Sequence, residues 1–361
     1  MKKTLLTICL VWMCFSLSAQ KIIDLSGKWS FSIDRQDNGE KEKWFSHTLN
    51  DFINLPGSMP EKLKGDEVTA KTQWTGSLYD SSYYYNPYME KYRKEGNIKF
   101  PFFLTPDKHY VGAAWYQKEV NIPADWKGER ILLFLERPHI ETTVWVNGQK
   151  TGMQNSLCVP HQYDITHYVR PGKCTITIRV DNRIKEINVG PDSHSITDQT
   201  QGNWNGIVGR ICLQTTPKTY FDDIQIYPEP EQKLARVKVV IKGTGTAKVK
   251  LSAESFNTDK KHIVPAIQQE IKLNKGVTET EMVLPMGNDM LLWDEFHPAL
   301  YKLKAEVTNG KKTEIKEIQF GMRRFEIKGK WFYVNGRKTQ LRGTVENCDF
   351  PLTGYAPMDV E

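Results

Sequence analysis

A polar run at residues 194–203 contains the side chains best suited to bind a small polar ligand. It includes Asp198 and Asn203, with His194 and Gln201 beside them. A carboxylate accepts hydrogen bonds and an amide both donates and accepts them, so together they can pair with the hydroxyl groups of a sugar. The alternative interpretation is an ordinary turn, in which short polar side chains bond to their own backbone.

Other site chemistries have no pattern in the sequence. There is no Ser/His/Asp arrangement and no glycine-rich phosphate loop. Cys158, Cys174, Cys212 and Cys348 are scattered and lack the spacing of a metal site. We therefore expect no metal and no cofactor, and we interpret the four cysteines as buried free thiols.

Aromatic residues crowd together between Trp74 and Tyr116, where Pro87, Pro101 and Pro106 interrupt any regular pattern. A long irregular segment in a compact domain is often functional. It can equally be a loop that packs on itself and covers the edge of a sheet. The segment 74–116 is therefore interpreted either as a contact region for a substrate or as a structural covering.

The elements that must position these residues are strands. Apolar and polar residues alternate over 29–33, 176–180 and 301–305, which predicts strands with one buried and one solvated face. Asn147-Gly148 and Asn335-Gly336 lie between strand-like runs and predict tight hairpins. Many short strands joined by turns indicate β-sandwiches.

The first residues have the pattern of a secretory leader. Lys2 and Lys3 precede an apolar run that ends before Ala19, after which we expect cleavage. No later stretch is long and apolar enough to predict a membrane-spanning helix. The sequence therefore indicates a secreted protein, periplasmic or extracellular.

The charge pattern does not indicate nucleic-acid binding. The formal net charge is +6, but the lysines are spread along alternating strands such as 237–239 and 248–251. A nucleic-acid interface needs a clustered basic surface, so we expect no such partner.

Several segments resemble glycoside hydrolase family 2, which includes β-galactosidases, β-glucuronidases and β-mannosidases. The similarity extends over about 25–343 and depends on the number and order of the matching pieces. These pieces are Trp115-Tyr116-Gln117-Lys118, Val144-Trp145-Val146-Asn147-Gly148, Asp181-Asn182, Trp204-Asn205-Gly206, His297-Pro298-Ala299-Leu300-Tyr301, Phe320-Gly321-Met322-Arg323-Arg324-Phe325 and Leu341-Arg342-Gly343.

The resemblance implies a mainly β chain with four parts. These are a signal peptide at 1–19, a jelly-roll sugar-binding domain at 20–217, an immunoglobulin-like sandwich at 218–320, and the truncated start of a (β/α)8 barrel at 321–361. A complete barrel of this type needs roughly 250 residues. The family's two catalytic glutamates come from later barrel strands, so we expect them outside this chain.

Substrate-binding positions are also implied by the resemblance. The candidates are Asp198, Asn203, Trp204, Glu346 and Asn347. Asn347 stands where many relatives have a histidine, which indicates a divergent subfamily. The contact of Glu346 and Asn347 with sugar is weighed against a structural role.

The resemblance implies a secreted exo-β-glycosidase that hydrolyses O-glycosyl bonds, and this chain alone would be inactive because it lacks most of the barrel. The expected partners are a carbohydrate substrate and the missing barrel domain; galactose, glucuronic acid and mannose all remain compatible. One alternative is a stand-alone carbohydrate-binding protein without catalysis. Another is an adhesion protein built of two sandwiches.

Overall fold

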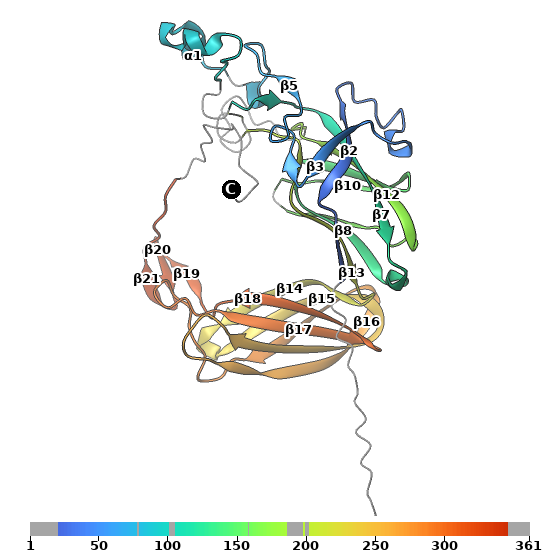
Figure 1. Ribbon diagram of the computed structural model, residues 1–361. Coiled ribbons are helices and arrows are strands. Elements are labelled where there is room, and N and C mark those ends of the chain that lie inside the picture. The colour runs from blue at the N-terminus through green and yellow to red at the C-terminus, as the bar shows by residue number, and fades with distance from the viewer. Residues whose placement is uncertain are drawn as a thin grey trace, which may run out of the picture. The chain divides into compact units, whose positions relative to one another are not determined.

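The computed structural model describes residues 21–345 except 78, 101–104, 158, 186–197 and 199–201. The expected leader, Cys158, Cys348, Glu346 and Asn347 lie outside the described residues. The described chain divides into an N-terminal unit, 21–216, and a C-terminal unit, 217–342, each with its own core (Figure 1).

The N-terminal unit is a β-sandwich of two antiparallel sheets. One has the strand order β1-β13-β8-β11, with β4 beside β13, and the other has the order β10-β9-β12-β7-β2-β3. The first sheet contains β1 (Ile22–Asp24), β4 (Gly57–Ser58), β8 (Arg130–Pro138), β11 (His161–Asp164) and β13 (Gly206–Thr216). The second contains β2 (Gly27–Asp34), β3 (Asp51–Leu55), β7 (Ala113–Ile122), β9 (Glu141–Val146), β10 (Gln149–Asn155) and β12 (Gly172–Asp181).

The core of this sandwich comes from the predicted alternation. Trp29 and Phe31 of β2 and Ile176 and Ile178 of β12 belong to one buried cluster between the sheets. The prediction that the opposite face is solvated is wrong for β12, because Arg179 is only 7% exposed. The segment 35–50 folds over this outer face, which is therefore a second, smaller interior.

Indole rings build that second interior. Trp115 and Trp145 stack with their centroids 4.9 Å apart, and Phe45 stacks on Trp145 at 5.2 Å. A Cβ on Gly39 would lie 2.5 Å from Nε1 of Trp115, so only glycine fits where the covering segment crosses the indole. The aromatic residues of 35–50 thus cover polar side chains of β12, such as Arg179, which the alternation of the strand alone would leave exposed to solvent.

The aromatic segment, residues 65–111, leaves the sandwich between β4 and β7 and carries the α-helix of the described chain, α1 (Ser81–Tyr85) (Figure 1). Trp74, Tyr83 and Phe100 form a separate small core, so the segment packs on itself, while its contact with a substrate stays a prediction. The segment also contains the short strands β5 (Asp66–Glu67) and β6 (Lys108–His109) and the 3-10 helices η2 (Thr75–Ser77) and η3 (Pro87–Arg93). Three further 3-10 helices lie outside this segment, namely η1 (Trp44–Ser46), η5 (Ala124–Trp126) and η6 (Pro230–Gln232).

The C-terminal unit is built around two long strands. Its strands are β14 (Tyr220–Glu229), β15 (Leu234–Ser255), β16 (Ile263–Pro285), β17 (Tyr301–Asn309) and β18 (Lys312–Phe320). β15 changes partners along its length, from β14 before Gly243 to β17 after Gly245. Tyr301, Leu303 and Ala305 of β17 are fully buried and the two lysines between them are partly exposed, so the alternation predicted there is confirmed.

Both Asn-Gly pairs form the predicted hairpins. Asn147 and Gly148 have φ values of 51° and 78°, and Asn335 and Gly336 have 49° and 77°, as a two-residue turn requires. The second turn joins β20 (Trp331–Val334) to β21 (Arg337–Thr339), which form a small antiparallel sheet with β19 (Phe325–Lys328). The barrel strand expected in 321–361 is not seen in 321–345. No helix of the described residues is long and apolar enough to cross a membrane.

Candidate functional site

Asp198 joins two segments that are far apart in the sequence. Its side chain is 1% exposed, and its two oxygens accept hydrogen bonds from the backbone N–H groups of Thr75 and Asn203, both at 2.6 Å. Thr75 belongs to the aromatic segment, whereas Asn203 precedes β13. A buried carboxylate with two backbone donors fixes the geometry of both segments.

Asn203 continues this connection into the sandwich. Its amide donates to Oγ1 of Thr75 at 2.9 Å and to the carbonyl of Asn182 at 3.0 Å, and its Oδ1 accepts from the amide of Asn182 at 3.0 Å. Asn182 in turn donates to the carbonyl of Tyr110 and accepts from the N–H of Gly112, each at 2.8 Å. Every one of these amide groups is satisfied inside the protein.

Asn205, directly before β13, also binds the backbone through its side-chain amide, as Asn182 does. Its amide donates to the carbonyls of Gly112 at 2.9 Å and Val180 at 3.0 Å. Its Oδ1 accepts from the hydroxyl of Tyr116 at 2.7 Å. Asn182 and Asn205 therefore bracket Gly112, and the ends of β7, β12 and β13 are joined by side chains.

Two histidines flank this network. Nε2 of His109 lies 3.7 Å from Oδ2 of Asp198 and has no hydrogen-bond partner among the described residues. His139 stacks on Trp204, with centroids 4.6 Å apart. Burial lowers the pKa of His139 to about 4, although its hydrogen bond with Asn203 and the charge of Asp198 oppose this. His139 is therefore a neutral ring at physiological pH.

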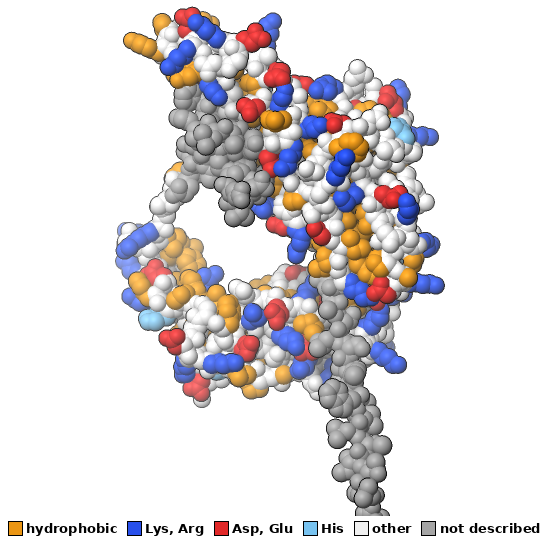
Figure 2. Space-filling model, viewed as in Figure 1, with side chains coloured by type: hydrophobic (Ala, Val, Ile, Leu, Met, Phe, Trp, Pro, Cys, Tyr) orange, Lys and Arg blue, Asp and Glu red, His pale blue; other side chains and the backbone are white. Residues whose placement is uncertain are grey.

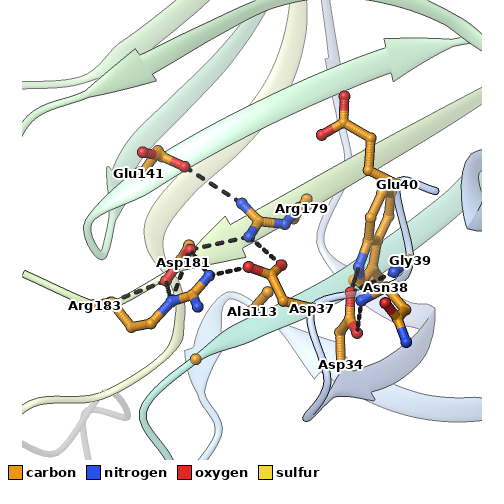
Figure 3. A network of polar contacts seen from close by, with 12 residues as sticks. Asp34, Asp37, Asn38, Gly39, Glu40, Ala113, Glu141, Arg179, Asp181 and Arg183 are labelled. Carbon is orange, nitrogen blue, oxygen red and sulfur yellow. Dashed lines mark hydrogen bonds and ion pairs between the residues drawn. The ribbon is translucent and has the colours of Figure 1, made fainter. Parts of the chain in front are cut away.

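A network of ion pairs lies at the end of β12, on the outer face of the sheet (Figure 3). The guanidinium of Arg179 contacts Asp37 at 2.6 Å and Asp181 at 3.0 Å, and that of Arg183 contacts the same two carboxylates at 2.5 and 2.6 Å. Glu141 and Lys185 extend the network. Three cations thus face three carboxylates, and the covering segment is tied to the strand through Asp37.

The side chain of Asp181 stays ionised although it is fully buried. Burial opposes its charge, but hydrogen bonds from Arg183 and Lys185 outweigh burial and hold the pKa of Asp181 well below its ordinary value of 3.8. The same contacts raise the pKa of Arg183. The network is a structural ion cluster, since each charge is matched by an opposite one.

The structure brings together three of the five predicted site residues. Asp198, Asn203 and Trp204 lie in one region, and internal contacts occupy the polar groups of Asp198 and Asn203. Their contact with sugar stays a prediction, as does that of Glu346 and Asn347, which lie outside the described residues. The sequence analysis did not predict the roles of Asn182 and Asn205. Their positions were the available signal, because Asn182 directly follows one strand and Asn205 directly precedes the next.

Comparison with known proteins identifies the family. Residues 22–217 match the family model described as glycosyl hydrolases family 2, sugar binding domain, and residues 219–323 match the model described as glycosyl hydrolases family 2. The first match alone covers more than half of the chain. The chain belongs to glycoside hydrolase family 2.

Its relatives include named glycosidases. A beta-glucuronidase from Paenibacillus borealis is 23% identical over 355 residues, which cover 93% of this chain and 51% of the relative. Human beta-glucuronidase is 23% identical, with 92% of this chain and 49% of the relative covered. A beta-galactosidase from Thermoanaerobacter pseudethanolicus is 25% identical, with 73% and 35% covered. The chain spans at most about half the length of these relatives.

Solved structures show the same fold. Beta-glucuronidase from Ruminococcus gnavus superposes with a TM-score of 0.61 at 19% identity, covering 90% of this chain and 49% of that one. A beta-glucuronidase from an uncultured Clostridium gives 0.60 at 21% identity, with 89% and 48% covered. These likenesses confirm the predicted β-sandwich architecture.

We expect Asp198→Ala to loosen the aromatic segment without unfolding the sandwich. Two backbone N–H groups lose a charged acceptor, so amide exchange within 65–111 should accelerate by about tenfold. Hydrogen–deuterium exchange with mass spectrometry measures this. Asp294→Ala is the matched control, because Asp294 also accepts from two backbone N–H groups but lies in the C-terminal unit. Unchanged exchange in 65–111 would contradict the role of Asp198.

We expect Asp181→Asn to lower the free energy of unfolding at neutral pH by about 3 kcal/mol, because it breaks a buried ion cluster. The folded-state pKa of Asp181 is depressed, so its contribution is complete above 3.8 and is lost as the pH falls below that value. The variant should therefore lose less stability than the wild type on acidification. Urea unfolding followed by tryptophan fluorescence tests both points.

Asp125→Asn is the control for this measurement. Asp125 pairs with Lys21, but both side chains are exposed, so the stability should be unchanged. If both substitutions lowered the free energy of unfolding equally, burial of the Asp181 cluster would not contribute to stability.

Proposed function

We propose that this chain forms the two accessory sandwiches of a secreted, exo-acting β-glycosidase that hydrolyses O-glycosyl bonds with retention. The observation that carries the proposal is the succession of two family matches, 22–217 and 219–323, in the order of the family's sugar-binding and immunoglobulin-like parts. The relatives' names favour a β-glucuronide or a β-galactoside as substrate.

The described carboxylates support an accessory role. A retaining enzyme needs two carboxyl groups about 5–5.5 Å apart, one as nucleophile and one as acid/base. Among the described residues the fully buried carboxylates are Asp34, Asp181 and Asp198. Each is occupied by backbone N–H groups, an indole or cations, which leaves none free to attack or to carry a proton. The catalytic pair is therefore proposed to come from a barrel beyond this chain.

The proposed contribution of the N-terminal unit is the placement of a loop. Asn182 and Asn205 fix both ends of the connection between β12 and β13, and Asp198 holds it to the aromatic segment. Asp198, Asn203 and Trp204 would then belong to one wall of a sugar-binding pocket whose other wall is the barrel.

We expect the chain alone to hydrolyse neither p-nitrophenyl β-glucuronide nor p-nitrophenyl β-galactoside. The same chain, extended by the in-frame sequence that follows Glu361 in its gene, should hydrolyse one of them. Release of nitrophenolate measures both. Turnover by the chain alone would place the catalytic carboxylates within it and refute the accessory role.

We further propose export from the cytoplasm, on the leader pattern of residues 1–19. Expression in a Gram-negative host should give a periplasmic product that begins at Gln20, as N-terminal sequencing would show. The variant Leu10→Arg interrupts the apolar run, and its product should keep Met1 and stay in the cytoplasm. A wild-type product that retains Met1 would contradict export.

A further inference from the structure

Three tyrosines of the aromatic segment project into solvent. Tyr79, Tyr85 and Tyr88 are 59%, 77% and 86% exposed, and they lie on or beside α1 and η3. Figure 2 shows apolar side chains among charged ones around α1, which stands away from the two sheets of the N-terminal unit in Figure 1. Exposed apolar groups that gather in one patch mark interaction sites, whereas singly scattered ones are normal.

The rings are held on a rigid support. Beneath them lies the small core of Trp74, Tyr83 and Phe100. The hydroxyl of Tyr83 donates to the carbonyl of Tyr92 at 2.6 Å, and the side chain of Asp80 caps α1 by accepting from the N–H of Ser82 at 2.7 Å. Because the support is already ordered, binding would not require the segment to fold, and its entropy cost would be limited to the rings themselves.

The rings also support one another. Tyr79 stacks on Tyr84 with centroids 4.9 Å apart and planes 11° from parallel. Tyr84 in turn packs edge-on against the buried Tyr83, with centroids 5.1 Å apart. Asn86 begins the next helical turn by accepting from the N–H of Tyr88 at 2.9 Å, so Tyr88 stands at a fixed place after Tyr85.

The charge around the tyrosines is balanced. Between residues 79 and 97 three cations, Lys91, Arg93 and Lys94, oppose three carboxylates, Asp80, Glu90 and Glu95. A surface without net charge is a poor match for a polyanion such as nucleic acid or a sulfated glycan. Tyrosine offers an apolar ring face together with a hydroxyl that donates and accepts. A pyranose ring presents the complement, an apolar C–H face edged by hydroxyl groups.

We propose that Tyr79, Tyr85 and Tyr88 form an accessory binding surface for sugar rings of an uncharged polysaccharide. The choice of ligand rests on the proposed glycosidase function, but the surface is distinct from the region around Asp198. It would hold a polymer chain while its end is hydrolysed elsewhere.

The test is affinity electrophoresis of the full chain in gels containing galactomannan, xyloglucan or arabinogalactan, with polygalacturonate as the anionic comparison. We expect at least one neutral polymer to retard the chain and polygalacturonate to have less effect. The double variant Tyr85→Ala/Tyr88→Ala should bind about tenfold more weakly, since two ring contacts are lost. The double variant Tyr85→Phe/Tyr88→Phe should keep most of the binding, because the ring faces remain.

Tyr227→Ala is the matched control, because Tyr227 is also an exposed tyrosine, at 50%, but lies on β14 of the C-terminal unit. Circular dichroism of each variant establishes that it is folded. Two outcomes overturn the proposal: no retardation by any neutral polymer, or equal retardation of the wild type and the alanine variant. In the second case, a shift from dimer to monomer in the alanine variant, measured by size-exclusion chromatography, would assign the rings to self-association.

Hydrolysis of small substrates separates the accessory surface from the proposed glycosidase function. In the extended enzyme, the alanine variant should hydrolyse small nitrophenyl glycosides at the wild-type rate, since these substrates do not reach the accessory surface. A loss of that activity would instead place the tyrosines in the catalytic pocket and overturn the accessory role.

Discussion

The side-chain amides of Asn182 and Asn205 are the contacts on which the N-terminal unit's loop architecture depends. Both are fully buried, and both reach Gly112 at the start of β7 from opposite sides. A buried amide left without partners would cost several kcal/mol, so the surrounding backbone can take few other arrangements. The end of the aromatic segment and the residues directly before β13 are placed by this requirement, and Asp198 then links Asn203 to Thr75.

Two kinds of polar interior occur within one sheet. Between the sheets, neutral amides bind backbone carbonyl and N–H groups, and their geometry is insensitive to pH. On the outer face, Arg179 and Asp181 use opposite charges, which respond to acid and depend on the covering segment that carries Asp37. The two networks meet at the end of β12, where Asp181 belongs to the ion pairs and the adjacent Asn182 belongs to the amide contacts.

The fold could be predicted from the sequence where one local pattern decides it. The Asn-Gly hairpins and the alternation of β17 follow from turn chemistry and from burial of one face. The buried outer face of β12 could not be predicted, because it depends on a segment more than a hundred residues earlier that folds over it. For the site, the sequence indicated the polar residues Asp198 and Asn203, but it could not show that their partners would be Thr75 and Asn182 rather than solvent or ligand.

The aromatic stack of the outer face has an optical consequence. Trp115 and Trp145 lie 4.9 Å apart with their planes 30° from parallel. Indoles held in a fixed, asymmetric arrangement contribute to near-ultraviolet circular dichroism, and that signal exists only while fixed tertiary packing persists. Because Phe45 of the covering segment stacks on Trp145, the signal also depends on the contact between that segment and the sheet. It therefore reports the packing of the outer face separately from the loss of secondary structure.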